Sequence, residues 1–396
     1  MADQITTIPK GWQKLPINDL VDIVIDNRGR NPDYYVLKGV PVIDNVLIKG
    51  ERKVNLNEAR RFIDDDTYSS FIRKYNQEND VLITLVGNGY GNVALSPKEK
   101  SIIMQNTIGL RCNDSGDNVF LFYNLSLNKR ILADLNIGAV QPSIKVGDLL
   151  SVELIIPPIS EQRAIAAVLS SLDDKIELLR EQNKTLEATA QAIFKEWFVN
   201  FNFPGATGKM IDSELGEIPE GWKIGTVNYF IKRETLSYRC DQDDLSAKGK
   251  TPIIDQGTGG LYGYTEREPD FQASKENPVI LFTNHTCNMW FVNYPFCAIQ
   301  NVIPFRGNSE YDIFFVFYMT LGRVSFIEYK GHWPDFEQKE YVIPTSDIAN
   351  KFAETVKPLQ YKIWNNNSQT QILSTLRDTL LPKLMKGEIR VKGFKN

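Results

Sequence analysis

The sequence predicts an α+β fold in which two pseudo-symmetric globular parts are separated by two long antiparallel coiled-coil helices. Three observations predict it: a heptad pattern that runs from Pro158 to Phe198, a second heptad pattern near the C-terminus, and short phrases that occur twice in the same order. The expected boundaries are residues 1–157 for the first globular part, 158–203 for the first helix, 204–344 for the second globular part, and 345–396 for the second helix with its C-terminal tail.

The first long helix is predicted by apolar residues that recur at spacings of four and three, with no Pro or Gly between Pro158 and Pro204. Its seam contains Ile165, Leu169, Leu172, Ile176, Leu179, Leu186, Ala190, Ile193 and Trp197, and Asn183 is its single polar member. At about 1.5 Å per residue such a helix is about 60 Å long, which is more than a small domain needs for its own core. We therefore expect a spacer that pairs with another helix.

An internal repeat supplies the partner helix. The phrase Ile-Pro-x-Gly-Trp occurs at residues 8–12 and again at 218–222. A second seam follows at the matching place and contains Phe352, Val356, Leu359, Ile363, Leu373 and Leu380, with Asn366 and Thr370 as polar breaks. Two copies related by a pseudo-two-fold axis make the helices antiparallel. Asn183 is then expected to meet Asn366 or Thr370 and to fix the register of the pair.

The second helix contains residues that usually interrupt helices. Pro358 lies inside the heptad pattern and is expected to kink or divide the helix. Pro382 and Gly387 follow the last seam residue, and we expect them to end it.

Each globular part is predicted to consist of short strands joined by turns, with one or two helices. In the first part the expected strands are residues 21–25, 40–43, 81–86, 108–111 and 152–156, with a helix at 119–129. In the second part the expected strands are 278–283, 302–305 and 341–343, with a helix at 313–321.

Composition narrows the classes of function. No apolar run reaches the length of about eighteen residues that a membrane span needs, so we expect a cytoplasmic protein with no membrane partner. Four cysteines without a CxxC pair and two histidines predict neither a metal site nor a disulfide framework. The formal net charge of −4, from 45 Lys plus Arg against 49 Asp plus Glu, is untypical of a nonspecific nucleic-acid binder. Any such contact must come from local basic patches. The candidates are residues 27–30, Lys49 with Arg52 and Lys53, residues 60–61 and residues 73–74.

Catalytic motifs are weak throughout the sequence. The Gly-rich stretch at 87–91 follows a strand pattern, but no helix pattern follows it as a dinucleotide loop requires. The stretch from Asp335 to Lys339 contains the residue types of a Mg²⁺-dependent nuclease motif, yet one residue between the two carboxylates cannot form the hairpin that the motif needs. His285 and Cys287 lack a third partner for nucleophilic catalysis. We therefore predict no catalytic or metal-binding residue, and a nuclease is the alternative.

Recognition of double-stranded DNA is the remaining chemistry. The predicted loops at strand ends hold Arg side chains, which suit guanine, and Asn or Gln side chains, which suit adenine. The candidates are Asn27, Arg28, Arg30, Asn31, Asn88, Tyr90, Asn92, Gln105 and Asn106 in the first globular part, and Gln256, Thr258, Tyr262, Tyr264, Asn284, His285, Gln300, Asn301 and His332 in the second. An equally supported role for the Gln-Asn pairs at 105–106 and 300–301 is hydrogen bonding to the local backbone.

Three stretches carry a resemblance to a known family. Residues 157–162 open the first long helix, the repeated Ile-Pro-x-Gly-Trp phrase begins each copy, and residues 380–389 close the second helix. Over essentially its full length the chain resembles the DNA-specificity (S) subunit of a type I restriction-modification system. A loop at residues 26–32 also resembles one that such subunits carry in their recognition domains.

The resemblance implies a non-catalytic subunit with two target-recognition domains, each of which reads one half of an asymmetric bipartite site. It also implies partner methyltransferase (M) subunits, which methylate DNA with S-adenosylmethionine, and restriction (R) subunits, which use ATP and Mg²⁺. No cofactor is expected in this chain. The alternative is a nuclease or bifunctional restriction enzyme that acts alone, and Mg²⁺-dependent cleavage that is lost in Glu337→Ala would favour it.

Overall fold

The computed structural model describes residues 8–87, 89–136, 142–257, 260–328 and 330–393. The chain folds as two compact units: unit 1 consists of Met1–Leu178 and Gln369–Asn396, and unit 2 consists of Leu179–Ser368. Each unit therefore contains one globular part and one portion of each long helix. Among the described helices, none is long and apolar enough to cross a membrane.

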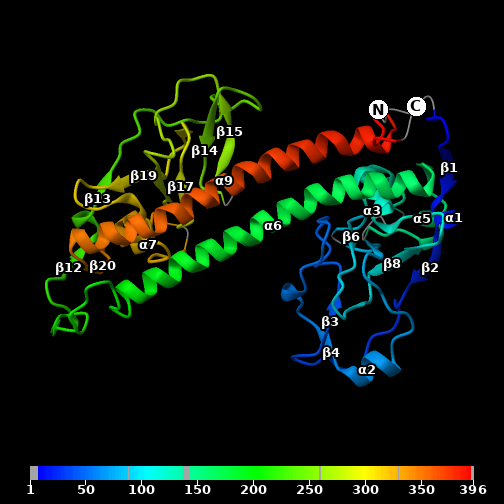
Figure 1. Ribbon diagram of the computed structural model, residues 1–396, viewed down its shortest axis with the longest axis horizontal. Coiled ribbons are helices and arrows are strands. Elements are labelled where there is room, and N and C mark those ends of the chain that lie inside the picture. The colour runs from blue at the N-terminus through cyan, green and yellow to red at the C-terminus, as the bar shows by residue number, and fades with distance from the viewer. Residues whose placement is uncertain (1–7, 88, 137–141, 258–259, 329, 394–396) are drawn as a thin grey trace. The chain divides into compact units, whose positions relative to one another are not determined.

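Two sheets and a strand pair form the globular part of unit 1 (Figure 1). The antiparallel four-stranded sheet has the order β2 (Val21–Ile25), β8 (Thr107–Cys112), β5 (Val81–Thr84) and β6 (Val93–Leu95). The second sheet has the order β4 (Phe62–Ile63), β3 (Val40–Ile43) and β7 (Ile102–Ile103), with β3 and β7 parallel, and β1 (Gln13–Pro16) pairs with β9 (Glu153–Ile156). The helices are α1 (Ile17–Leu20), α2 (Asp65–Ser70), α3 (Asn118–Leu127), α4 (Lys129–Asp134) and α5 (Val146–Leu150).

Unit 2 repeats this topology strand for strand. Its four-stranded sheet has the order β13 (Ile231–Arg233), β19 (Val302–Gly307), β16 (Val279–Thr283) and β17 (Met289–Val292). Its second sheet has the order β15 (Leu261–Thr265), β14 (Thr251–Ile254) and β18 (Cys297–Ala298), with β14 and β18 parallel, and β12 (Lys223–Thr226) pairs with β20 (Glu340–Ile343). A further hairpin joins β10 (Met210–Ile211) to β11 (Ile218–Pro219), and the helices are α7 (Ile313–Thr320) and α8 (Trp333–Gln338). The repeat predicted from the sequence is thus confirmed in three dimensions.

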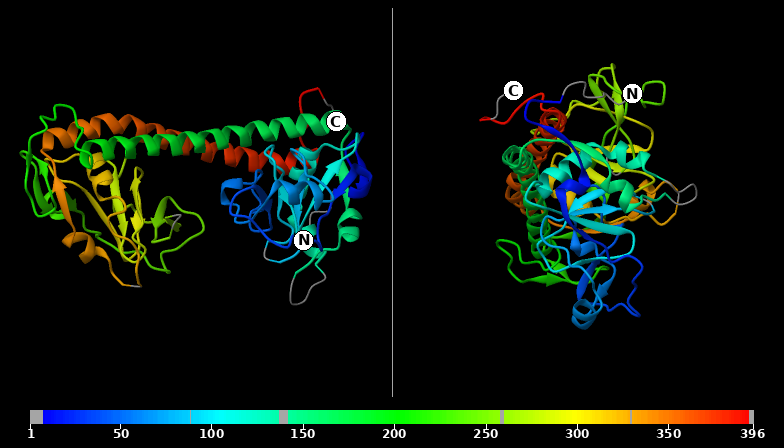
Figure 2. Two further views of the ribbon diagram at one scale, coloured as in Figure 1. Left: turned by 90° about the horizontal axis from the view of Figure 1, so that it is seen from below. Right: turned by 90° about the vertical axis from the view of Figure 1, so that its right-hand side faces the viewer.

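In each four-stranded sheet one central strand, β5 in unit 1 and β16 in unit 2, is buried on both faces. Along β5, Val81 and Ile83 pack into a core with Phe120 of α3, whereas Leu82 packs with Ile43 of the second sheet. Alternate residues of a strand point to opposite faces, so a helix and a second sheet together cover β5 completely. Figure 2 shows α3 (cyan) between the strands of unit 1 and the long helices, and the core of unit 1 continues to Ile165 of α6.

The two long helices are α6 (Ile159–Phe198) and α9 (Ser346–Met385). In unit 1, Asp173 of α6 accepts a hydrogen bond from Arg377 of α9 at 2.7 Å. In unit 2, the ring centroids of Phe198 and Phe352 lie 5.1 Å apart. Residue numbers therefore rise along α6 as they fall along α9, which confirms the antiparallel arrangement.

The predicted seam lies between the helices in both units. Eight of its apolar members are buried, namely Ile165, Leu169, Ile176, Leu179, Ala190, Phe352, Val356 and Ile363, and seven are half-buried, namely Leu172, Leu186, Ile193, Trp197, Leu359, Leu373 and Leu380. Of its polar members, Asn366 is buried, and Asn183 and Thr370 are half-buried. The Asn366 amide donates to Asn183 Oδ1 at 2.9 Å, and the Asn183 amide donates to Asn367 Oδ1 at 2.7 Å. The predicted meeting of Asn183 and Asn366 is confirmed, and a polar pair of this kind disfavours other registers of the coil.

Neither proline interrupts α9. Of the two effects expected of Pro358, a kink or a division, the division does not occur, and the expectation that Pro382 helps to end the helix was wrong, because the helix continues from Ser346 to Met385. Proline removes the hydrogen bond to the carbonyl four residues before it, and both Pro358 and Glu354 are exposed, so water can satisfy that carbonyl. The helix ends instead before Gly387, which adopts the left-handed conformation (φ +68°) typical of a C-terminal cap.

Candidate nucleic-acid interface

In unit 1 the sheet gathers several loops at one edge. Because β8 is antiparallel to both β2 and β5, the ends of β2 and β5 lie beside the start of β8. The loop after β2 (residues 26–31), the loop after β5 (residues 85–92) and the turn before β8 (residues 104–106) therefore meet, and we call them the loop edge of unit 1. Asn88 lies outside the described residues.

Hydrogen bonds tie this loop edge together. The Gln105 amide donates to Asn31 Oδ1 at 3.1 Å, and Arg61 donates to Gln105 Oε1 at 2.9 Å. Arg61 also pairs with Asp44 at 2.8 Å, and its guanidinium carbon lies 5.4 Å from the ring centroid of Tyr35. In the sequence, Arg61 is recognisable only as a member of the basic patch at residues 60–61. No local pattern indicates that Arg61 lies beside Gln105, because the two residues are far apart in the sequence.

Two further arginines, Arg28 and Arg30, belong to the loop edge and are half-buried. Arg28 donates to both carboxylate oxygens of Asp26, at 2.9 and 2.7 Å. Burial acts to raise the pKa of Asp26, but the hydrogen bonds from Arg28 outweigh it and the pKa is lowered overall. Arg30 donates to the Phe71 carbonyl at 3.1 Å. Both guanidinium groups are thus positioned in advance, which suits bidentate recognition of a base.

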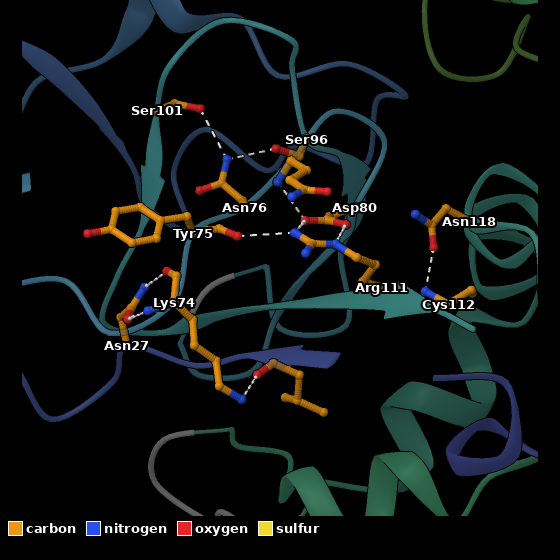
Figure 3. A network of polar contacts seen from close by, with 12 residues as sticks. Asn27, Lys74, Tyr75, Asn76, Asp80, Ser96, Ser101, Arg111, Cys112 and Asn118 are labelled. Atoms are coloured by element: carbon orange, nitrogen blue, oxygen red, sulfur yellow. Dashed lines mark hydrogen bonds and ion pairs between the residues drawn. The ribbon is translucent and has the colours of Figure 1, made fainter. Parts of the chain in front are cut away.

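Asn27 is a structural residue and not a base-contacting one. Its side chain is 1% exposed, and its amide donates to the carbonyls of Lys74 and Ile103 at 2.8 and 3.1 Å. Its oxygen accepts from the backbone N–H groups of Arg73 and Lys74 at 3.3 and 3.2 Å. Figure 3 shows this clamp between Asn27 and Lys74. The prediction that Asn27 contacts DNA is corrected, because the backbone uses both ends of its amide.

Replacement of Asn27 with alanine should therefore lower stability. Each backbone group left buried without a partner costs about 1–3 kcal/mol, so we expect Asn27→Ala to destabilise the protein by at least that amount. Urea unfolding of the full chain measures it, with the exposed neighbour Asn31→Ala as the matched control, for which a change within about 0.5 kcal/mol is expected. Equal stability of the two variants would contradict the structural role.

In unit 2 a loop edge is built from residues 284–288 and 300–301, which match the loop after β5 and the turn before β8, and from residues 255–257, which follow β14 and therefore match the segment after β3. The backbone N–H of His285 donates to Gln256 Oε1 at 3.0 Å, and the Thr286 hydroxyl donates to the Gln256 carbonyl at 2.9 Å. Gln300 is exposed, Asn301 is half-buried, and Tyr262 and Tyr264 lie half-buried on β15. Thr258 lies outside the described residues.

Two predicted residues of unit 2 have structural roles. His332 is fully buried, with Nδ1 3.0 Å from Asp335 and Nε2 3.1 Å from the Glu328 carbonyl. Asn284 Oδ1 accepts from the backbone N–H of Trp333 at 2.8 Å. These contacts fix α8 against the end of β16. His332 is therefore removed from the residues predicted to contact DNA, and the side-chain oxygen of Asn284 is already engaged.

The Gln-Asn pairs make equivalent turns in the two units. Leu85 N–H donates to the Asn106 carbonyl at 2.8 Å, and Asn284 N–H donates to the Asn301 carbonyl at 2.8 Å. Gln105 and Asn301 have positive φ angles of 58° and 69°. The main chain of each pair thus holds the loop after the central strand, while the Gln105 side chain is bonded to Asn31 and Arg61.

Comparisons with known proteins agree with this architecture. Residues 9–188 match the type I restriction modification DNA specificity domain. The match covers slightly less than half of the 396 residues. The whole chain is 26% identical to the type I restriction enzyme MjaIX specificity subunit of Methanocaldococcus jannaschii, over 98% of this chain and 96% of that protein. It is 40% identical to the HindI specificity subunit of Haemophilus influenzae over 88 residues, which are 21% of this chain and 19% of that protein.

A solved structure has the same fold. The type I restriction-modification S subunit of M. genitalium superimposes with a TM-score of 0.63 at 18% sequence identity, over 96% of this chain and 97% of that one.

The first acidic residue of the stretch that resembles a nuclease motif is engaged by its neighbours. Asp335 and Glu337 lie on the single helix α8, and Asp335 pairs with His332 and, at 3.4 Å, with Lys330. The hydrogen bond from His332 is the main cause of the lowered pKa of Asp335. Within the described part of the chain, no three His, Cys, Asp or Glu side chains are grouped so as to hold a metal ion.

The repeated arginines Arg111 and Arg306 have structural roles. Arg111 donates to both oxygens of the buried Asp80 at 2.9 and 2.7 Å, within the network drawn in Figure 3. Its counterpart Arg306 donates instead to the carbonyls of Asn277 and Pro278 at 3.0 and 2.6 Å. Arg306 also lies 3.6 Å from the Glu234 carboxylate. The second copy therefore combines a longer ion pair with backbone acceptors at the end of the sheet opposite the loop edge.

Proposed function

We propose that this chain is the specificity subunit of a type I restriction-modification system. In this proposal it reads an asymmetric bipartite target in double-stranded DNA, one half with each loop edge, and directs partner M and R subunits to it. The observation that carries the proposal is the presence of two loop edges on the same sheet topology but with different side chains. In this proposal residues 1–157 and 204–344 are the recognition domains, and residues 158–203 and 345–396 provide the spacer helices.

The chemistry of the two loop edges differs, which favours two different half-sites. Unit 1 offers the guanidinium groups of Arg28, Arg30 and Arg61, which suit guanine O6 and N7. Unit 2 offers the exposed Gln300, whose amide suits adenine more than guanine, while the Gln256 side-chain oxygen and the Thr286 hydroxyl are bonded within the loop edge. Different side chains at the two loop edges are what an asymmetric target requires.

The assembly with partner subunits accounts for the absence of a strong basic excess. A net charge of −4 provides little nonspecific attraction to phosphates, so we infer that partner subunits supply much of it. The M subunits would bring S-adenosylmethionine, and the R subunits ATP and Mg²⁺. The chain itself contributes base reading and the distance between the half-sites.

The test is methylation profiling of a genome in which the full chain is expressed with its M subunits. We expect one methylated motif with two specified halves and a fixed gap. Arg28→Ala should relax one base position in one half by about 1–3 kcal/mol and leave the other half unchanged. Lys98→Ala is the matched control, because Lys98 is exposed after β6, away from the loop edge. A continuous motif without a gap would contradict the proposal, and unchanged specificity would remove Arg28 from the readout.

A further inference from the structure

The segment after β3, residues 44–54, connects the loop edge of unit 1 to helix α6. Near its middle, the Asn92 amide of the loop edge donates to the Ile48 carbonyl at 3.1 Å. Near its end, Arg52 pairs with Asp174, and it lies 3.8 Å from Glu177 of α6. One short stretch of chain therefore contacts both the surface that would read DNA and the spacer.

Burial makes this segment rigid. Leu47, Ile48 and Val54 are between 1% and 6% exposed and pack in a cluster between the two sheets of unit 1. Leu95 N–H of β6 donates to the Arg52 carbonyl at 2.7 Å. Three packed side chains and a hydrogen bond to a strand make the segment move together with the sheet. A shift of Arg52 relative to α6 is therefore transmitted to Asn92, because close-packed interiors deform little.

The contact with α6 is ionic and partly shielded from water. The Arg52 side chain is 11% exposed, and Lys53 adds a pair with Glu177 at 2.8 Å. The adjacent Asp173 accepts from the Tyr123 hydroxyl of α3 at 2.6 Å and from Arg377 of α9 at 2.7 Å. The consecutive carboxylates of Asp173 and Asp174 thus hold α3 and the segment 44–54 on α6. Two such contacts restrict rotation of the globular part about the helix.

The second copy uses different chemistry at the same places. Helices α6 and α9 both contain 40 residues, and their seams align from Ile165 with Phe352 onward, which places Tyr361 and Trp364 where the first copy has Asp174 and Glu177. Trp364 packs against Phe291 and Phe314, with ring centroids 5.7 and 5.9 Å away. Aromatic packing holds the second globular part, whereas charge pairs hold the first.

We propose that Arg52 is the positioning residue that sets the orientation of the unit 1 loop edge on the spacer helices, and so selects the gap between the two half-sites. The inference rests on the proposed bipartite recognition. Arg52 touches α6 and not the DNA in this proposal, so its loss should alter the gap while both half-site sequences stay the same.

The experiment compares methylation profiles of the full chain with its M subunits for wild type, Arg52→Ala and the double variant Asp174→Asn/Glu177→Gln. We expect both variants to raise methylation at sites whose gap is one base pair longer or shorter by about fivefold or more, the lower end of coupling between two sites. Arg52→Lys should keep the wild-type gap. Lys49→Ala is the control, because Lys49 pairs with Glu58, which follows the segment, and not with α6.

Each outcome is decisive. A wild type without a gap preference would contradict the proposed bipartite function itself. A wild type with one gap that Arg52→Ala and the double variant both retain would overturn only the role of Arg52. If Arg52→Ala fails to fold, the double variant decides, because Asp174 and Glu177 are 61% and 43% exposed in their side chains and their isosteric amides leave the helix intact.

Discussion

Replacement of Arg390 with methionine should destabilise unit 1 by about 3–5 kcal/mol, because it leaves a buried carboxylate without its cation. Glu161, at the start of α6, is fully buried and accepts from Arg390 at 2.6 Å and from the Trp12 indole at 3.1 Å. Arg390 follows α9 in the sequence, so its loss releases the C-terminal segment from the first strand region. Gly387 reinforces this contact, since a Cβ there would lie 2.6 Å from Pro9.

The effect should be confined to unit 1. Trp12 is the only one of the six tryptophans that lies in unit 1, so its fluorescence, isolated by comparison with Trp12→Phe, reports the unfolding of that unit in urea. Lys392→Met is the control, because Lys392 is exposed two residues later. The double variant Arg390→Met/Glu161→Leu should recover much of the loss, since it removes both charges. A loss below about 0.5 kcal/mol in Arg390→Met would contradict the argument.

In unit 2 the equivalent tryptophan is covered by aromatic side chains and not by a charged pair. Trp222, the counterpart of Trp12, is covered by Phe201 and Phe203, with ring centroids 5.5 and 5.1 Å away, and these residues follow α6. In both units the segment after a long helix therefore covers the tryptophan of an Ile-Pro-x-Gly-Trp phrase. Variants of Arg390 should leave the unfolding of unit 2 unchanged.

Matched insertions of seven residues, beside Asn183 in α6 and beside Asn366 in α9, should change the length of the target. One heptad adds about 10 Å to a helix, which corresponds to about three base pairs of DNA. Both insertions preserve the heptad pattern and the pairing of the two asparagines. We expect affinity for the original target to fall at least tenfold and a target with a gap about three base pairs longer to be preferred.

The measurement is binding of the complex with M subunits to duplexes whose gap increases one base pair at a time. An insertion in α6 alone is the control, because it breaks the pairing of the seams and should impair the protein for every gap length. A doubly inserted protein that folds and still prefers the original gap would show that the helices do not determine the spacing.

Much of the architecture could be predicted from the sequence, because the patterns that encode it are local. Heptad spacing places both long helices, and alternation with turn residues places strands such as 21–25 and 40–43 within the bounds that the structure has. The sequence repeat predicts that the two globular parts share one topology, even though it does not give the strand order of either sheet. Even the meeting of Asn183 with Asn366 follows from two periodic seams, since periodicity fixes relative register.

Burial and long-range pairing were decided only by the tertiary structure. Asn27 and His332 have residue types that suit DNA, but their surroundings engage them in the core. Arg52 and Asp174 are 122 residues apart, and Glu161 and Arg390 are 229 apart. A sequence pattern reports which face of its own element a residue occupies, whereas the partner across the fold depends on how elements pack. The helices and the repeat were thus determined by the sequence alone, and the side chains left at the loop edges were determined by tertiary packing.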